Sequence, residues 1–334
     1  MERTLRNLLA LSLLVGVLGG VEYFTSVDVP GFELKETGLS ISAVDYTEDQ
    51  LFSEGSEART SERDTSPARV EISDAHLGIV TWNLYNFGRT KDAQEIRVAA
   101  DLLRWYDLVA IQEVVTSPPG AQAVARLDAA LDRRGYAWDY RISNPTTGAG
   151  TERYAFLWKP SRVRLLGDAW LASSLSDRID REPYLARFQH KQTGDTVLVA
   201  SLHAVPRSKS PEREVALLDE LHRQYANEDI VLLGDFNLDE DDEAFDDLRT
   251  AGYRAVLDDQ KTSLGRTRSP EPEGHLASEY DNIFVETGPL HAVRGRAIDF
   301  TSQFPSLGEA RSLSDHLPVF VSVEWTGGQQ PLTP

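Results

Sequence analysis

The sequence predicts an α/β protein whose β-sheets are covered by helices. Short apolar runs alternate with amphipathic helical patterns from about Val70 to Trp325, and no repeat of fixed period is present. Hydrophobic residues make up 41% of the 334 residues and charged residues 26%, which is the composition of a folded soluble domain. Apolar strands interleaved with such helices are typical of sheets that carry helices on their faces.

The chain begins with a basic segment that leads into an apolar one. Arg3 and Arg6 precede Leu8–Val21, a run of fourteen residues without a charge. This length fits the core of a signal peptide better than a membrane span of about 20 residues. We therefore expect residues 1–21 to direct export, which makes the protein periplasmic or secreted. An uncleaved anchor that tethers the protein to a membrane is the alternative.

A polar and acidic segment follows. Residues 43–69 contain seven acidic residues and three arginines among many serines and threonines. Few of these side chains could be buried, and we predict a flexible acidic linker over residues 22–69. The folded domain is expected over residues 70–326, followed by a short tail over residues 327–334.

The domain is expected to contain strands separated by helices. The predicted strands are Gly78–Leu84, Leu108–Glu113, Tyr154–Trp158, Thr196–His203, Ile230–Asp235, Tyr280–Val285 and Val319–Trp325. The predicted helices are Ala93–Trp105, Gln122–Arg133 and Glu212–Tyr225. In the first helix, Ile96, Ala99, Ala100 and Leu103 lie on one apolar face, as expected of a helix that packs on a sheet.

Nearly every strong predicted strand ends or begins with a short polar cluster. These clusters are Trp82-Asn83, Gln112-Glu113, His203, Asp235-Phe236-Asn237, Asp281-Asn282 and Ser314-Asp315-His316. In antiparallel neighbours the end of one strand lies beside the start of the next, so the clusters can converge on one rim. A turn or a helix cap explains any one cluster alone. Six of them at strand ends predict a functional site.

The residue types in these clusters favour hydrolysis of a phosphate ester with a bound cation. Several carboxylates, two histidines and an amide suit a hard cation and acid–base chemistry. The formal charge of −19 argues against coating nucleic acid through bulk charge, although a local basic groove or a bound cation could serve an anionic substrate. The absence of cysteine excludes disulfides, thiolate catalysis and zinc–thiolate sites.

The clusters also resemble the ordered motif set of a known superfamily. The matching segments are Thr81–Phe87, Ile111–Glu113, Leu202–Pro206, Gly234–Asn237, Tyr280–Ile283 and Ser314–Pro318. They resemble the endonuclease/exonuclease/phosphatase superfamily over about Gly78–Val323. The segments Glu152–Tyr154, Arg181–Pro183 and Ala186–Phe188 look most like its deoxyribonuclease I branch. The resemblance implies a four-layer α/β (α+β) sandwich, with two packed, mainly antiparallel sheets flanked by helices.

The resemblance also implies a metal site and a substrate contact. Glu113 is expected to be the principal ligand of Mg²⁺ or Mn²⁺, with Asn83 and Asp315 near it. Ca²⁺ is a further candidate as a structural ion. Arg181 is either an exposed surface charge or a phosphate contact, and its Arg-Glu-Pro context favours the contact.

The catalytic groups follow from the same resemblance. His316, oriented by Asp281, is expected to act as general base toward water, and His203, oriented by Glu152, as general acid at the leaving oxygen. Asp235 and Asn237 are expected to position the nucleophile and to hold a phosphate oxygen. Family accounts differ on which histidine is the acid, and both orders stay open.

Two departures from the deoxyribonuclease I branch bear on the substrate. That branch carries an arginine two residues past the metal-binding glutamate and a tyrosine two residues before the histidine-pairing glutamate, and both enter the minor groove. Val115 and Gly150 stand at these positions. The departures put recognition of the duplex minor groove in doubt and leave single-stranded DNA or RNA open.

The leading hypothesis is therefore an exported, metal-dependent phosphodiesterase, an endonuclease with DNA as the expected substrate. A phosphatase or phospholipase of the same superfamily is the second hypothesis, and an inactive binding module is the third. A chemically competent side chain at every catalytic position argues against the binding module. No protein partner is evident, and we expect a monomer.

Overall fold

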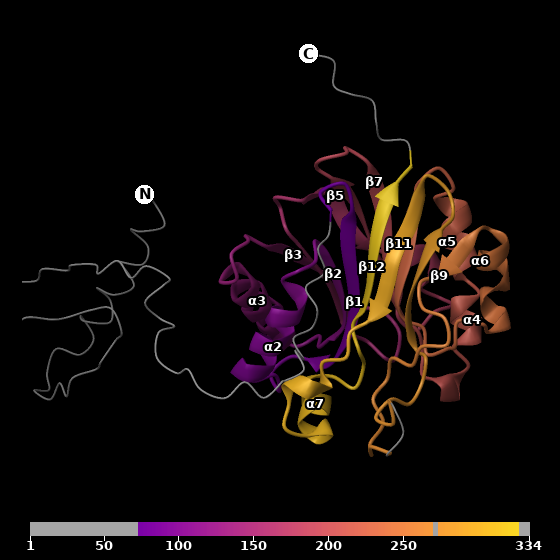
Figure 1. Ribbon diagram of the computed structural model, residues 1–334. Helices are drawn as coiled ribbons and strands as arrows, with labels where there is room; N and C mark the ends of the chain where they lie inside the picture. The colour runs from indigo at the N-terminus through magenta and orange to yellow at the C-terminus, as the bar shows by residue number, and fades with distance from the viewer. Residues whose placement is uncertain (1–72, 270–272, 327–334) are drawn as a thin grey trace, which may run out of the picture. The chain divides into compact units, whose positions relative to one another are not determined.

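The computed structural model describes residues 73–269 and 273–326 (Figure 1). The predicted signal segment over residues 1–21, the linker over residues 22–69 and the tail over residues 327–334 lie outside the described residues. Within the described ranges, every helix is too short or too polar to cross a bilayer.

The first sheet has six strands, and its centre carries two of the polar clusters. Its strand order is β11 (Leu290–Ala297), β12 (Val319–Trp325), β1 (Leu77–Phe87), β2 (Leu108–Val114), β4 (Arg153–Trp158) and β3 (Asp139–Ile142). The pair β1·β2 is parallel, and the other pairs are antiparallel. The sheet is therefore mainly antiparallel, as the resemblance implies.

The second sheet repeats this plan. Its strand order is β5 (Val163–Leu171), β6 (Tyr184–His190), β7 (Thr196–His203), β8 (Ile230–Asp235), β10 (Asp281–Glu286) and β9 (Tyr253–Ala255). The pair β7·β8 is parallel, and the other pairs are antiparallel. Each sheet thus has one parallel pair near its centre.

Helices cover the outer faces of both sheets (Figure 1). The helices α2 (Ala93–Leu103), α3 (Pro118–Asp132) and α7 (Leu307–Leu313) share a hydrophobic core with the first sheet. The helices α4 (Glu212–Val215), α5 (Leu218–Gln224) and α6 (Asp246–Thr250) share another with the second sheet.

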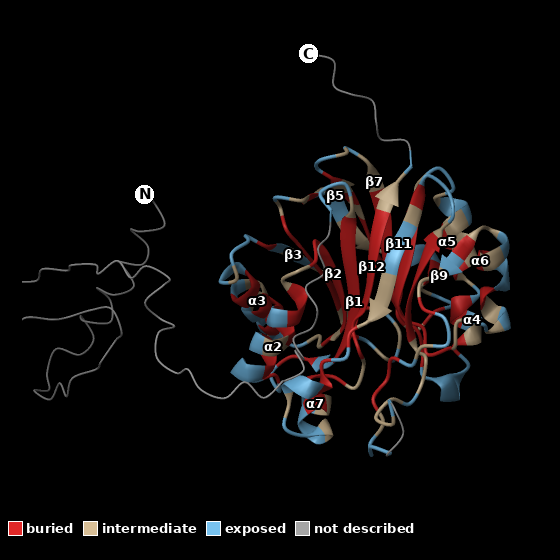
Figure 2. Cartoon of the chain, in the orientation of Figure 1, coloured by how far each residue is buried: buried red, intermediate tan, exposed pale blue. Residues whose placement is uncertain are grey.

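A third core lies between the two sheets. It joins apolar side chains of the first sheet, such as Ile79 and Val321, to side chains of the second, such as Val199 and Ile283. Figure 2 shows the buried residues concentrated along the strands, with exposed residues on the outer faces of the helices. Three cores separate four layers, and the predicted four-layer sandwich is confirmed.

All seven predicted strands are present, and two of the three predicted helices are confirmed with shifted ends. The prediction of one helix over Glu212–Tyr225 is wrong, because the chain forms α4 and α5 instead. Leu217, which lies between them, and Glu220, in the first turn of α5, donate backbone hydrogen bonds to residues three positions earlier. These i→i−3 bonds tighten the backbone and divide the segment.

The registers of the second sheet bring polar residues together. In the parallel pair β7·β8, His203 lies opposite Asp235, and in the antiparallel pair β8·β10, Asp281 lies opposite Asp235. Gly234 allows β7 and β8 to approach at this point, since a Cβ atom there would lie 1.9 Å from the carbonyl oxygen of Leu202. The expected convergence on one rim therefore occurs.

Candidate active site

Asp235 lies at the centre of the rim. Its side chain is 1% exposed, and its Oδ2 atom lies 3.5 Å from Nε2 of His203 and 3.6 Å from Nε2 of His316. The amide nitrogen of Asn83 donates to the same oxygen at 3.0 Å. One carboxylate oxygen thus faces both histidines, and it joins the rims of the two sheets.

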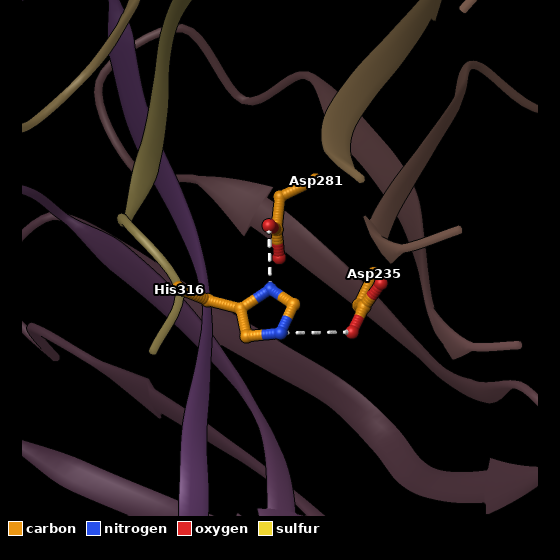
Figure 3. A group of neighbouring side chains, drawn as sticks. All are labelled: Asp235, Asp281 and His316. Carbon is orange, nitrogen blue, oxygen red and sulfur yellow. Dashed lines mark hydrogen bonds and ion pairs between the residues drawn. The ribbon is translucent and has the colours of Figure 1, made fainter. Parts of the chain in front are cut away.

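His316 lies between two aspartates (Figure 3). Its Nδ1 atom is 2.7 Å from Oδ2 of Asp281, and its Nε2 atom points toward Asp235. Burial lowers the pKa of His316, but Asp281 and Asp235 raise it more, from 6.5 to about 10. The site without a substrate therefore favours the imidazolium form.

Asp281 is itself held by a threonine. Thr262 donates its hydroxyl to Oδ2 of Asp281 at 2.8 Å and accepts the backbone N–H groups of Tyr280 and Asp281. Burial raises the pKa of Asp281 to about 6, although His316 acts to lower it. The other oxygen, Oδ1, is buried without a hydrogen-bond partner within the described part of the chain. Thr262 fixes the carboxylate that orients His316.

His203 forms a second histidine–carboxylate pair. Its Nδ1 atom lies 2.9 Å from Oε2 of Glu152, and both side chains are buried. Burial lowers the pKa of His203, yet Glu152 and Asp235 reverse this effect and the net shift is upward. The two predicted pairs, His203 with Glu152 and His316 with Asp281, are therefore both present.

Glu113 lies at the end of β2 in a strained backbone conformation. Its φ is +61°, in the left-handed region that non-glycine residues rarely adopt. Oε1 accepts the amide of Asn83 at 3.0 Å, and Oε2 accepts the backbone N–H of Asn86 at 2.6 Å. The backbone N–H of Glu113 donates to Glu152 at 3.1 Å. These bonds fix the carboxylate next to the histidine pairs.

The predicted metal ligands Glu113 and Asp315 both lie within electrostatic range of Lys91. Both Glu113 and Asp315 act on the pKa of Lys91, which burial lowers to about 8 although these carboxylates raise it. Asp315 also forms an ion pair with Arg311 at 3.1 Å. The two oxygens of Glu113 each accept one hydrogen bond, which leaves further lone pairs for a hard cation. This donor set fits Mg²⁺ or Mn²⁺.

Asn83 directs its amide nitrogen, not its amide oxygen, toward the carboxylates of the site. Its amide nitrogen points toward Glu113 and Asp235, whereas its Oδ1 atom accepts the backbone N–H of Tyr85 at 3.0 Å. Asn83 separates two carboxylates that would otherwise repel each other. One lone pair of Oδ1 remains for a cation.

The structure adds a second candidate group for a cation. Ligand atoms of Asp235, Asp281 and His316 all lie within 4.8 Å of one another. The unpartnered Oδ1 of Asp281 is an available oxygen ligand there. A cation bound by His316 would require a neutral imidazole and would take it out of proton transfer. The oxygen ligands of Glu113 and Asp315 leave both histidines free.

Arg181 is buried, and the alternative that it is an exposed surface charge is wrong. Its side chain donates from Nε to the carbonyl oxygen of His203 at 2.7 Å and from Nη2 to that of Ala204 at 2.5 Å. Its Nε atom also lies 3.8 Å from Glu152. Asn237 donates to the carbonyl of Ala204 at 3.0 Å. Both residues hold the loop after β7.

Several residues support the rim although no role was predicted for them from the sequence. Gln112 donates to Thr81 and to Ser201, which ties the two sheets together. Ser314 and Trp82 fix the segment that carries His316, through bonds to the carbonyls of Asn83 and His316. Gln112, Ser314 and Trp82 all belong to the polar clusters of the sequence. Thr262 stands in a long loop, where no sequence pattern marks it.

Comparisons with known proteins agree with this geometry. The sequence profile of the endonuclease/exonuclease/phosphatase family matches residues 80–316, more than half of the chain. The chain belongs to this family.

Curated relatives within the family carry the name deoxyribonuclease. The chain is 30% identical to a deoxyribonuclease of Thioalkalivibrio sp. (strain K90mix), over 75% of this chain and 72% of the relative. It is also 30% identical to deoxyribonuclease-1 of Canis lupus familiaris, over 74% of this chain and 92% of the relative.

Solved structures of family members share the fold. A family protein from Bacteroides thetaiotaomicron gives a TM-score of 0.57 at 18% identity, over 75% of this chain and 98% of that chain. A mannosyl-6-phosphatase of the same organism gives 0.57 at 19% identity, over 75% of this chain and all of that chain. One solved structure with this fold is thus named a phosphatase, whereas the curated sequence relatives are named deoxyribonucleases.

Proposed function

We propose that this family member is an exported nuclease that hydrolyses phosphodiester bonds of DNA with the help of a divalent cation. The observation that carries the proposal is the arrangement around Asp235, where one carboxylate oxygen faces two histidines that are each paired with a further carboxylate. The relatives named deoxyribonuclease support the choice of substrate class.

Hydrolysis of a phosphodiester requires deprotonation of water, protonation of the leaving oxygen and neutralisation of negative charge. His203 and His316 are the two proton-transfer groups, and Glu152 and Asp281 fix their tautomers through the Nδ1 atoms. Asp235 lies within reach of both Nε2 atoms, and it would orient the attacking water between them. This assigns a task to each side chain at the centre of the rim.

Glu113 and Asp315 would hold the cation, with Asn83 beside them. A bound Mg²⁺ or Mn²⁺ supplies positive charge to the phosphate oxygens and to the developing negative charge. Such charge is needed because the protein carries a formal charge of −19. Arg181 is the proposed phosphate contact, but it serves first to fix the loop after β7.

The order of acid and base is set by the protonation states. The expected order makes His203 the acid and His316 the base. The pKa of about 10 favours a charged His316 in the protein alone, which suits an acid better than a base. Positive charge from a cation near Asp315 would act in the opposite direction and favour the neutral form. Rescue of the histidine variants with a nitrophenyl phosphodiester therefore decides the order.

A substrate panel tests the proposed function. The full chain is incubated with duplex DNA, single-stranded DNA, RNA, an inositol polyphosphate and sphingomyelin, each with Mg²⁺ and with chelator. We expect cleavage of DNA in Mg²⁺ and none in chelator. Glu113→Gln keeps the shape and removes the charge, so this variant should need far more Mg²⁺.

The panel also separates the alternatives. Full activity in chelator would exclude the cation from the reaction. Hydrolysis of the inositol polyphosphate or of sphingomyelin in place of DNA would favour a phosphatase or phospholipase. Binding of DNA without turnover of any substrate would favour an inactive binding module.

Export is the remaining part of the proposal, and it rests on the sequence alone. The basic start and the run Leu8–Val21 support it. Expression of the full chain in a bacterium, followed by N-terminal sequencing of protein from the periplasm, medium and membrane, tests it. A mature chain without the run supports cleavage, and an intact chain in the membrane fraction supports an anchor.

A further inference from the structure

A surface hollow of about 330 Å³ lies between the loop after β1 and the start of α3. Its lining residues are Gly88, Arg89, Pro119, Gln122, Ala123 and Arg126. Two guanidinium groups and one amide thus provide its polar side-chain groups, and no carboxylate is among these residues. Guanidinium groups bind phosphate and carboxylate oxygens, so this lining suits an anion.

The hollow adjoins the strand that carries the main metal ligand. A Cβ atom at Gly88 would lie 2.5 Å from Val115, and one at Gly120 would lie 2.0 Å from the carbonyl oxygen of Val115. Val115 follows Glu113 by two residues, so their Cα atoms are at most about 8 Å apart. Asn86, which donates to Glu113, is two residues before Gly88. The hollow is therefore a neighbour of the catalytic rim.

The two arginines differ in how far they are already engaged. Arg89 is exposed, and within the described residues its side chain makes no hydrogen bond or ion pair. Arg126 donates to the carbonyl of Lys91 at 2.8 Å. It also acts on Glu95, whose pKa burial raises and Arg126 lowers. All the N–H donors of the Arg89 guanidinium are thus available to an anion. Arg126 has fewer available donors, because one of them is bonded to the carbonyl of Lys91.

The backbone at the start of α3 contributes few donors. Pro118 and Pro119 lack an N–H group, and the N–H of Gly120 already donates to the carbonyl of Ser117 at 2.9 Å. Binding in the hollow would therefore depend on the side chains of Arg89 and Arg126. Replacement of a single arginine should therefore weaken binding measurably.

We propose that this hollow binds a backbone phosphate of the nucleic acid strand, next to the phosphate that is cleaved. The inference rests on the nuclease function proposed above and adds a contact for the strand on the side of α3. In a protein with a formal charge of −19, a strand needs local cationic contacts of this kind. A substrate with a single phosphodiester would not extend from the rim into the hollow.

Strand binding provides the first test. The affinity of a fluorescent single-stranded 12-mer is measured with Mg²⁺ in a His203→Ala background, so that the strand stays intact. Arg89→Ala should raise Kd about tenfold, as expected for loss of a charged hydrogen-bonded contact. The slope of log K against log salt should fall by about 0.7 for one lost phosphate contact. Arg89→Lys should retain that slope.

Arg133→Ala is the matched control. Arg133 is exposed at the C-terminal end of α3, so the control removes the same charge from a position away from the hollow. Its Kd should stay within about twofold of the parent value, the range of a long-range charge effect. Equal Kd values for the two variants would overturn the inference.

A second test compares two substrates of otherwise active protein. The ratio of kcat/KM for the 12-mer to kcat/KM for bis(4-nitrophenyl) phosphate should fall about tenfold in Arg89→Ala. Inorganic phosphate would displace a single ion from the hollow, but it would not displace a strand that the protein holds at several phosphates. Added inorganic phosphate should therefore inhibit cleavage of the 12-mer only weakly. An equal loss for both substrates would place Arg89 in the rim itself and would reject a separate subsite.

The two proposals fail in distinguishable ways. Normal cleavage of DNA together with an unchanged ratio in Arg89→Ala would reject the subsite and leave the nuclease function intact. Hydrolysis of bis(4-nitrophenyl) phosphate by a protein that neither binds nor cleaves the 12-mer would reject both.

Discussion

The carboxylates of the site differ in their hydrogen-bond partners and in their burial, although they are chemically alike. Asp281 is buried and paired with His316 and Thr262, so it fixes an imidazole. Glu113 is less buried and accepts from Asn83 and Asn86, so it keeps lone pairs for a cation. Each role is set by the neighbouring groups of the carboxylate and by its burial.

Substitution of the histidines tests their role as proton-transfer groups. His203→Ala and His316→Ala should each lower kcat by about 10²- to 10⁴-fold, with fold and DNA affinity nearly unchanged. A nitrophenyl phosphodiester has a good leaving group, so it should restore activity to the variant that lacks the acid. The expected rescue is in His203→Ala. Rescue of His316→Ala would exchange the roles, and wild-type turnover in a folded double variant would exclude the mechanism.

The pKa of His316 also predicts a pH dependence of stability. Because its pKa rises from 6.5 to about 10 on folding, the folded protein holds this proton more tightly than the unfolded chain. The stabilising contribution is complete below pH 6.5 and is lost as the pH rises through about 10. Asp281, with a pKa of about 6, titrates below this window.

Chemical denaturation in chelator measures this effect. The difference in unfolding free energy between the wild type and His316→Gln should shrink from pH 7 to pH 10, above the titration of Asp281. His203 is present in both proteins, so its own titration largely cancels. A difference that is constant or grows with pH would contradict the raised pKa.

At the level of strands, the contact between β7 and β8 determines how the site is assembled. The register that places His203 opposite Asp235 needs a close approach at Gly234, whose φ of +141° is also rare for other residues. Any side chain there meets the carbonyl of Leu202. The glycine next to Asp235 is therefore a requirement of the strand pairing.

Gly234→Ala should lower both stability and activity. The added methyl group would force β7 and β8 apart, at a cost of about 2 kcal/mol or more. A shift of His203 away from Asp235 should reduce kcat further. Gly288→Ala is the control, because nothing lies within 4 Å of its added Cβ, and its midpoint of urea denaturation should change little. Equal midpoints for the two variants would contradict the close approach.

On the scale of the whole molecule, the site joins two sheets within a highly acidic protein. Asn83 of the first sheet donates to Asp235 of the second, and Gln112 donates to Ser201 across the same boundary. The rim collects carboxylates from both sheets, and these are part of the acidic excess that gives the formal charge of −19. Under the proposed function, an anionic strand would therefore need added cations to bind at this rim.

Divalent cations should increase DNA affinity beyond the effect of ionic strength. In a His203→Ala, His316→Ala variant, DNA should bind more tightly in Mg²⁺ than in a monovalent salt of equal ionic strength, because the cation supplies charge at Glu113 and Asp315. Glu113→Gln in this background should lose most of the gain. Fluorescence anisotropy measures both, and equal affinity in the two salts would contradict the cation-dependent site.

Removal of the N-terminal segments tests the expected domain boundary. A chain of residues 70–326 should keep the Tm and the turnover of the full chain, since the three cores and the rim lie within it. Thermal melts and the cleavage assay measure this. A large fall in Tm would show that residues 1–69 stabilise the domain.

The sequence alone predicted the polar clusters, the main strands and the family. Buried strands such as β8, with every residue buried, are continuous apolar runs that local pattern identifies. The four edge strands β3, β5, β9 and β11 were not predicted. An edge strand pairs on one side only and keeps exposed polar residues, as β11 does at Arg294, so its apolar signal is weak. The interior strand β6, next to the edge strand β5, was also missed.

Only the tertiary structure decided how these residues act on one another. It placed one oxygen of Asp235 between two histidines, buried Arg181 against the loop after β7, and brought Thr262 to Asp281. Strand register and the packing of two sheets produce these contacts between residues far apart in sequence. Local periodicity and motif spacing carry no information on such distances, so a sequence specifies the groups of a site before it specifies their geometry.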